Sequence, residues 1–523
     1  MVFARTCLTS VSLRSVKNRK AKKILTDRKI SLLQCIHFFG IAADFSLFKR
    51  RHHSVVRDTI FALSSGHGKC GVSVIRTSGP ASGDALQLLT GWKQLPPPRR
   101  VTLTSLLCPT TGELLDRGLV LWFSGPKSFT GEDCCEYHVH GGPAVVMGVL
   151  QALGTVQMLR PAEPGEFTKR AFQNGKLDLT EAEGLGDLIH AETEIQRRQA
   201  LRQMSGELGQ LYQKWSHRLV TALAHVEAFI DFSEDDNVEE NVLTSVDSEV
   251  KNLQEELEDH LKDSRRGERL RDGLHLVLAG ATNAGKSSLL NLTSQKPAAI
   301  VSPIPGTTRD VVETVLNIGG YPVIMSDTAG LRDSEDPVEK EGVRRAKERL
   351  DNADILIAVV DASKVPITRI SILAHLKSLL SFPSSEGKLR EVLLVLNKSD
   401  LLDPPGHAKV QELCKDPELP TACFLSCQTG QGVGDFIYIL KQKLEKICGD
   451  PLHGAPSLTQ TRHRLHLNKC LEALEQYTIY REQDLVLAAE ELRISYRELG
   501  AITGRVGVEG ILDIIFRDFC IGK

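Results

Sequence analysis

The chain has 523 residues, of which 41% are hydrophobic and 25% are charged, as in an ordinary soluble globular protein of roughly three or four domains. The formal net charge of -2 excludes a protein-wide positive field that gathers nucleic acid, so an RNA partner requires a local patch or a second protein. The 12 cysteines contain no CxxC pair, which argues for reduced thiols over a disulfide framework or a zinc site.

Residues 1–57 are predicted to be a mitochondrial transit segment without stable structure. The stretch 1–29 is rich in Arg, Lys and Ser, and Asp27 is its one acidic residue. The apolar stretch 30–43 that follows is too short for a comfortable membrane span. The alternative is a disordered basic tail on a cytosolic protein. No other segment has the length and apolarity of a transmembrane helix, so we expect no integral membrane segment.

Residues 58–178 are predicted to form an α+β domain. The stretches 71–79 (GVSVIRTSG) and 117–125 (RGLVLWFSG) are typical of strands bounded by glycine turns. A short helix is expected between them, at 83–92 (GDALQLLTGW).

Residues 179–271 and 451–523 are predicted to be two parts of one helical domain. A first apolar series recurs at steps of three and four, which predicts one face of a single long helix: Leu201, Met204, Leu208, Leu211, Trp215 and Leu219. A second series repeats the pattern: Val250, Leu253, Leu257 and Leu261. The same spacing returns near the C-terminus: Leu471, Leu474, Ile511, Leu512, Ile515 and Phe516. We interpret all three series as helix-bundle core rather than as a cofactor site.

Residues 272–450 are predicted to form an α/β domain inserted into the helical domain. Short apolar runs at 274–280, 323–327, 355–361 and 391–397 alternate with polar or helical sequence. Buried parallel strands with crossover helices have this pattern. We expect a doubly wound, mostly parallel sheet of the Ras-like P-loop type.

The strongest motif is GATNAGKS at 280–287, which fits G-x-x-x-x-G-K-[ST] between a predicted strand and a predicted helix. Its glycines let backbone N–H groups surround a phosphate, and the helix N-terminus adds its dipole. Lys286 is expected to reach the β- and γ-phosphates, and the hydroxyl of Ser287 is expected to bind Mg²⁺.

Three further motifs identify the nucleotide as GTP. DTAG at 327–330 places Asp327 to hold Mg²⁺ through water and Gly330 to donate its N–H to the γ-phosphate. NKSD at 397–400 ends in Asp400, whose carboxylate can accept two hydrogen bonds from the edge of guanine that adenine lacks. SCQ at 426–428 follows a predicted strand, where a loop behind the base belongs. The expected GTP contacts are Asn283, Ala284, Gly285, Lys286, Ser287, Ser288, Thr307, Thr308, Asp327, Thr328, Ala329, Gly330, Asn397, Lys398, Asp400, Ser426, Cys427 and Gln428.

The catalytic apparatus is expected to differ from that of Ras. Leu331 stands where Ras-type GTPases use a glutamine to orient the attacking water, so another residue must position the water. Thr308 in GTTRD can close over Mg²⁺, and the side-chain carbonyl of Asn283 can hold a monovalent cation. Glu339 is a candidate to position water, and a solvated charge at a helix end is the alternative that its sequence context alone favours.

These motifs, together with RPAEPGEFTKRAFQNGKLDLTEAE at 160–183 and the terminal FCIGK, resemble those of the MnmE/TrmE tRNA-modification GTPases, and more closely their mitochondrial form. The resemblance covers residues 58–523. It implies a homodimer whose N-terminal domain binds tetrahydrofolate and mediates dimerisation, with a K⁺ ion in the role of an arginine finger. It further implies an FAD-dependent partner of the MnmG/GidA type. The expected activity is taurinomethyl or aminomethyl modification at position 5 of the wobble uridine of mitochondrial tRNAs, in the matrix.

The resemblance also implies roles for individual residues. The K⁺ ligands correspond to Asn283, Ser302, Ile304 and Thr307, and the Mg²⁺ ligands to Ser287 and Thr308. The catalytic residues correspond to Lys286, Glu339 as the water-positioning glutamate, and Cys520 as a nucleophile or proton carrier. The contacts to a folate of the 5,10-methylene or 5-formyl type correspond to Arg76, Glu136, Lys176 and Lys523. Gly522 and Lys523 do not fit a prenylation motif, and the apolar stretch before Cys520 predicts a docked tail.

Two other functions are compatible with the GTP motifs. A GTP-switched assembly factor would bind ribosomes or RNA without chemistry on a base. A folate-dependent one-carbon transferase would use GTP for regulation alone. The upstream folate-type domain and the terminal thiol favour the tRNA-modifying enzyme over both.

Overall fold

A computed structural model describes residues 58–232, 241–262, 265–294, 313–327, 353–364, 366, 368–380, 391–449, 457–506, 512, 515–517, 519 and 522. The chain divides into two units, Met1–Asp58 and Thr59–Lys523. All described helices and strands belong to the second unit. The predicted transit segment, 1–57, lies outside the described residues.

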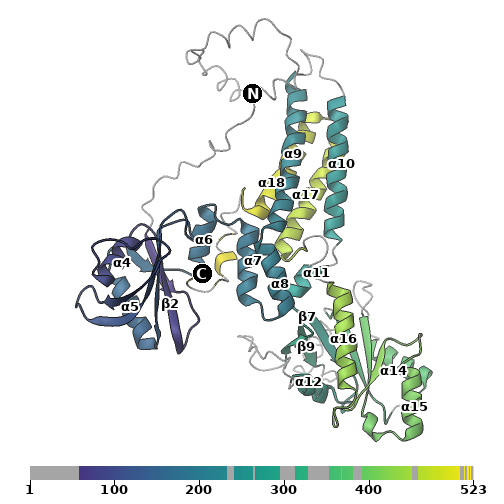
Figure 1. Ribbon diagram of the computed structural model, residues 1–523. Coiled ribbons are helices and arrows are strands. Elements are labelled where there is room, and N and C mark those ends of the chain that lie inside the picture. The colour runs from purple at the N-terminus through teal and green to yellow at the C-terminus, as the bar shows by residue number, and fades with distance from the viewer. Residues whose placement is uncertain are drawn as a thin grey trace, which may run out of the picture. The chain divides into compact units, whose positions relative to one another are not determined.

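The N-terminal part is an α+β fold, as predicted. Its strands are β1 (Thr59–Leu63), β2 (Cys70–Ser78), β3 (Val101–Leu107), β4 (Leu114–Phe123), β5 (Cys134–Gly141) and β6 (Leu159–Pro161). They form one sheet in the order β3-β4-β5-β2-β1-β6, in which β1 and β6 are parallel and the other neighbours antiparallel. The helices are α4 (Ser82–Thr90), α5 (Pro143–Gly154) and α6 (Glu166–Gln173) (Figure 1).

One face of this sheet is covered by helices α4 and α5. Leu86 of α4 and Leu153 of α5 are buried in one cluster with Ile75 of β2 and Tyr137 of β5. Because side chains alternate between the two faces of a strand, the residues before and after Ile75 and Tyr137 lie on the opposite face. Arg76 and Glu136 belong to that second face.

A helix bundle is built from segments on both sides of the α/β part. Its helices are α7 (Leu179–His190), α8 (Glu194–Met204), α9 (Glu207–Phe232), α10 (Asn241–Leu261), α11 (Arg266–Asp272), α17 (Thr461–Tyr480) and α18 (Leu485–Thr503). Trp215 of α9, Val250 of α10, Leu474 of α17 and Leu492 of α18 are buried in one core. These four helices lie side by side (Figure 1). The prediction that the α/β part is inserted into one helical domain is therefore confirmed.

The prediction of one long helix from Leu201 to Leu219 is wrong. The chain breaks between α8 and α9 at Gly206, whose φ is 83°. A side chain at Gly206 would put its Cβ 2.9 Å from Oε1 of Glu181, so a left-handed turn and a close neighbour both favour glycine there. Leu201 and Met204 are consequently 41% and 36% exposed, while Trp215 stays in the core.

The α/β part is a doubly wound, mostly parallel sheet, as predicted. Its strands are β7 (Leu274–Ala279), β8 (Glu313–Ile318), β9 (Tyr321–Asp327), β10 (Ile355–Asp361), β11 (Glu391–Asn397) and β12 (Ala422–Phe424). Its helices are α12 (Lys286–Ser294), α14 (Arg369–Leu380), α15 (Pro404–Leu413) and α16 (Val433–Cys448), with a 3-10 turn, η1 (Ser399–Leu401). The order is β12-β11-β10-β7-β9-β8, and β8 is antiparallel to β9. The sequence patterns did not identify β8.

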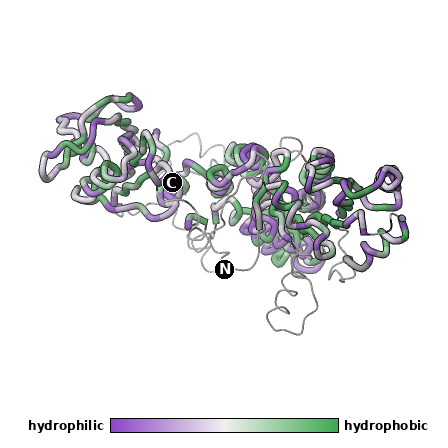
Figure 2. The backbone as a smooth tube through the Cα atoms, turned by 90° about the horizontal axis from the view of Figure 1, so that it is seen from below, coloured by the Kyte–Doolittle hydropathy of each residue, from purple (hydrophilic) through white to green (hydrophobic). Residues whose placement is uncertain are grey.

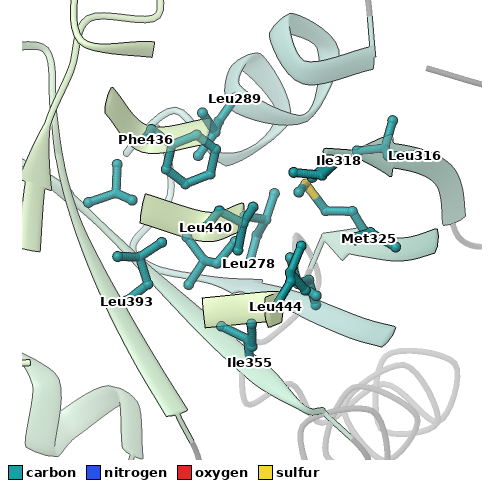
Figure 3. Close-up of a cluster of buried hydrophobic side chains, with 14 of the residues drawn as sticks. Leu278, Leu289, Leu316, Ile318, Met325, Ile355, Leu393, Phe436, Leu440 and Leu444 are labelled. Carbon is teal, nitrogen blue, oxygen red and sulfur yellow. The ribbon is translucent and has the colours of Figure 1, made fainter. Parts of the chain in front are cut away.

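Alternate strand residues pack against α16. Phe436, Leu440 and Leu444 of that helix point toward the sheet, which contributes Leu278 of β7 and Leu393 of β11 (Figure 3). This core holds the parallel strands in register, so that the carboxyl ends of β7, β9, β10 and β11 meet at one edge of the sheet. Ligands of open α/β folds bind at this edge.

Within the residues that the structure describes, no helix combines the length and apolarity that crossing a membrane requires. Figure 2 shows hydrophilic and hydrophobic residues interspersed along the described parts of the backbone.

Candidate nucleotide-binding site

The loop between β7 and α12 requires glycine at two positions. Gly285 has a φ of 103°, and a Cβ there would lie 2.0 Å from Nδ2 of Asn397. A Cβ at Gly280 would lie 2.2 Å from the carbonyl oxygen of Val359. Asn283, at the tip of the loop, has a φ of 63°, which asparagine adopts more readily than most residues. Both motif glycines are therefore required by the close approach of β10 and β11.

Lys286 points back into this loop from the first turn of α12. It is 7% exposed, and its Nζ donates to the carbonyl oxygens of Gly280 and Ala281, each at 3.0 Å. The ammonium group is thus held at the N-terminus of α12, where the loop, the helix dipole and the lysine charge all favour an anion.

Ser287 and Asp327 meet at the carboxyl edge of the sheet. The Ser287 hydroxyl donates to Oδ2 of Asp327 at 2.6 Å. The other carboxylate oxygen, Oδ1, is buried and has no hydrogen-bond partner within the described part of the chain. Hydroxyl and carboxylate oxygens are hard ligands, so Ser287 and Asp327 fit Mg²⁺, the ion that the sequence predicts here.

Asn397 ties the phosphate loop to the predicted base loop. Its Nδ2 donates to the carbonyl oxygen of Ala284 at 2.8 Å, and its Oδ1 accepts from the backbone N–H of Cys427 at 3.2 Å. Asn397 is 2% exposed, and Ser426 is fully buried behind the loop. Asn397 therefore joins the two loops, and Ser426 lies behind the base loop.

The loops enclose a cavity of about 600 Å³. Most of its lining was predicted from the sequence: Asn283, Gly285, Lys286, Ser287, Ser288, Asn397, Lys398, Asp400, Cys427 and Gln428. Thr282 and Leu401 also line it and were not predicted, although each is adjacent to a predicted residue. Ala284 is buried beneath the loop, and Asp327 lies at its edge in contact with Ser287. Burial raises the pKa of the Cys427 thiol to about 11, so this lining cysteine is neutral at physiological pH.

Ten predicted site residues lie outside the described residues: Ser302, Ile304, Thr307, Thr308, Thr328, Ala329, Gly330, Glu339, Cys520 and Lys523.

The predicted folate contacts that are described lie on or near the second face of the N-terminal sheet. Arg76 donates to Oε1 of Glu136 from Nη2 at 2.7 Å and from Nε at 3.1 Å, across directly paired positions of β2 and β5. The ring of Phe129 lies 5.5 Å from the guanidinium carbon. Lys176 is exposed after α6. The structure therefore places Arg76 and Glu136 in contact with each other. The folate contact of Lys176 stays a prediction.

The C-terminal tail is docked, as predicted, at the residues that the structure describes. Phe516 and Phe519 are buried with Leu179 of α7. The Ser64 hydroxyl, just after β1, donates to the carbonyl oxygen of Gly522 at 2.9 Å. The tail thus contacts both α7 and the end of β1.

Comparisons with known proteins match the N-terminal part and the helical part of this chain. The family model described as "GTP-binding protein TrmE N-terminus" matches residues 59–176, and the one described as "MnmE helical domain" matches residues 179–520. The chain is 59% identical to the 5-taurinomethyluridine-[tRNA] synthase subunit GTPB3, mitochondrial, of Danio rerio, over 89% of this chain and 93% of the relative. It is 58% identical to the protein of that name from Homo sapiens, with the same coverage. It is 47% identical to the tRNA modification GTPase MnmE of Paramagnetospirillum magneticum, over 89% of this chain and 100% of the relative.

Proposed function

Because this chain belongs to the MnmE/TrmE family of tRNA-modification GTPases, we propose that it hydrolyses GTP as a subunit of the enzyme that makes 5-taurinomethyluridine in tRNA. The proposed target is position 5 of the wobble uridine of mitochondrial tRNAs, and the added group is taurinomethyl or a related aminomethyl. We further propose that the protein is located in the mitochondrial matrix, that it acts with an FAD-dependent partner of the MnmG/GidA type, and that it binds a tetrahydrofolate derivative.

The observation that carries this proposal is the shared cavity of the phosphate loop and Asp400. Lys286 supplies positive charge at the phosphate end. Asp400 supplies a carboxylate at the base end, which can accept the N1–H and N2–H₂ donors of guanine. A bound Mg²⁺ would neutralise charge on the phosphates, and Ser287 with Asp327 would hold it.

Nucleoside mass spectrometry of mitochondrial tRNA from cells depleted of this protein tests the proposal. We expect wobble uridines to lose the taurinomethyl group and to recover it when the wild-type chain is restored. Unmodified uridines together with normal ribosome assembly would favour the enzyme. Intact wobble uridines with defective ribosomes would instead support the GTP-switched assembly factor. If the protein is a folate-dependent transferase in which GTP is only regulatory, modification should persist when GTP hydrolysis is blocked.

A potassium requirement is a separate prediction for Asn283. Its exposed position in the cavity leaves its side-chain oxygen available to a monovalent cation beside the phosphates. We expect turnover in K⁺ to exceed turnover in Na⁺ by roughly tenfold or more, and Asn283→Ala to remove that difference. Because alanine is strained at a φ of 63°, GDP affinity is measured in parallel, and Asn283→Gly, which removes the side-chain oxygen without that strain, is tested beside it. Equal wild-type rates in the two salts would reject the cation role.

The second face of the N-terminal sheet is covered by Phe167 of α6 at β1 and is exposed at β3 and β4, and this exposed part supports the proposed homodimer. Leu103 of β3 and Leu119 of β4 are directly paired on this face and are 56% and 39% exposed, and Val101 beside them is 58% exposed. Contiguous apolar exposure of this kind marks an interaction surface. We expect Leu103→Glu with Leu119→Glu to yield monomers in analytical ultracentrifugation. Leu88→Glu, at an equally exposed leucine on helix α4, should leave the dimer intact. A dimer that survives the paired change would place the interface elsewhere.

A further inference from the structure

We propose that Asp361 is a positioning residue for nucleotide binding, because it anchors Lys398 so that the lysine stem forms a wall of the base pocket. This inference rests on the proposed GTP-binding function and adds a residue to it. Asp361 is the last residue of β10 and pairs in register with Asn397, the last residue of β11. The backbone N–H of Ala362 donates to the carbonyl oxygen of Asn397 at 2.9 Å. The carboxylate is thereby fixed beside the turn that carries Asp400.

Both carboxylate oxygens of Asp361 are engaged. Oδ2 accepts from Nζ of Lys398 at 2.7 Å. Oδ1 accepts from the hydroxyl of Ser363 at 2.6 Å and from its backbone N–H at 3.1 Å. The residue is 7% exposed and does not line the cavity. Asp361 therefore acts on the cavity through Lys398 and has no direct contact with it.

The charge of Asp361 is retained in this environment. Partial burial opposes its ionisation, but the hydrogen bonds from Lys398 and Ser363 outweigh burial and hold the pKa of the carboxyl below its ordinary value. The ion pair with Lys398 is charge-assisted and short, which is the stronger class of hydrogen bond.

Lys398 lies in the lining of the cavity between Asn397 and Asp400. Its backbone φ is 63°, and its side chain is 29% exposed. Because the ammonium group is held at Asp361, away from the lining, the part that faces the cavity is the methylene stem. Lysine stems commonly cover apolar surface while their charge is satisfied elsewhere. A purine whose polar edge is held by Asp400 would therefore contact the apolar methylene stem of Lys398.

The benefit to binding is preorganisation. A free lysine side chain has many rotamers, and ordering it on ligand binding lowers the affinity. Asp361 restricts Lys398 before the nucleotide arrives, so nucleotide binding avoids that loss. Asp361→Asn keeps an oxygen for Ser363 but turns an N–H₂ group toward the ammonium of Lys398, which breaks the anchor at nearly constant volume.

The test is the affinity of the full chain for GDP, measured by titration calorimetry. We expect Asp361→Asn and Lys398→Met, which keeps the stem but removes the charge, each to weaken GDP binding about five- to tenfold. The double variant should bind no more weakly than either single variant, because both changes remove one interaction. Affinity for inorganic pyrophosphate, which reaches only the phosphate loop, should not change.

Lys364→Ala is the matched control. Its Nζ lies 4.0 Å from the same oxygen of Asp361, but its side chain is 69% exposed and does not line the cavity, so GDP affinity should be unaltered. Thermal unfolding verifies that every variant folds. Unchanged or tighter GDP binding by Asp361→Asn, or additive losses in the double variant, would overturn the inference. Failure of the wild-type chain to bind GDP would instead refute the proposed function itself.

Discussion

Replacing Gly285 by alanine is expected to weaken GTP binding by about 100-fold or more and to abolish turnover. Two effects of the methyl group add. Alanine at a φ of 103° is strained, which costs about 1–2 kcal/mol. The methyl group would also lie 2.0 Å from Nδ2 of Asn397, a side chain that is 2% exposed and cannot move freely.

Displacing Asn397 would break the contacts that join the two halves of the cavity. Its Nδ2 would lose the carbonyl of Ala284, and its Oδ1 would lose the N–H of Cys427. Leaving such buried groups unpaired costs about 1–3 kcal/mol. Together with the backbone strain, this loss accounts for the expected change in affinity.

Gly91→Ala is a control that introduces backbone strain without a steric clash. Gly91 has a φ of 71°, a methyl group there would have open space for 4 Å around it, and the residue lies at the end of α4, outside the nucleotide-binding part. We expect this change to lower the free energy of unfolding by about 1 kcal/mol and to leave GTP affinity intact. Fluorescent-nucleotide titration measures the affinity. Near-normal binding by Gly285→Ala would mean that the loop tolerates a side chain against Asn397.

Replacing Gly522 by alanine is expected to abolish tRNA modification and leave GTP hydrolysis unchanged. Gly522 has a φ of 93°, and a Cβ there would lie 2.2 Å from the carbonyl oxygen of Leu63 and 3.0 Å from Cα of Ser64. These neighbours are backbone atoms and cannot rotate away. The terminal residues would have to lift off, with loss of the hydrogen bond from Ser64 to the Gly522 carbonyl.

The consequence follows from the position of Gly522 in the sequence. It lies between Cys520 and Lys523, which we propose as the functional thiol and a folate contact. Displacement of a reacting group by about 1 Å costs on the order of 100-fold in rate. Nucleoside mass spectrometry of tRNA measures modification, and phosphate release measures hydrolysis.

Cys520→Ser and Gly112→Ala complete this experiment. Cys520→Ser should reproduce the phenotype of Gly522→Ala, because both remove the thiol from its place. Gly112→Ala, at a φ of 71° with nothing within 4 Å of a Cβ, should leave modification intact. Full modification by the Gly522 variant would show that the tail need not be docked on β1.

The sequence by itself determined the buried parallel strands of the α/β part and the positions of its phosphate loop and base loop. The motifs at 280–287 and 397–400 are contiguous, and each lies at the end of an apolar run that became a buried parallel strand, β7 or β11. Local sequence is sufficient in such cases, because a parallel sheet aligns the carboxyl ends of its strands at one edge. The insertion into a helical domain also followed from periodicity, since apolar spacing identifies helices on either side of the insertion.

Only the tertiary structure decided the contacts between distant parts of the chain. The apolar periodicity of the sequence runs through Gly206 without interruption. The break between α8 and α9 depends on a turn at Gly206 that packs against Glu181, a contact the periodicity does not contain. Asp361 is an ordinary strand-end acid in the sequence, and its partner Lys398 lies 37 positions away. Ser64 and Gly522 are 458 positions apart. Hydrophobic periodicity specifies which face of an element is buried, whereas the partner of a polar group depends on how whole elements pack, and that information is absent from any local pattern.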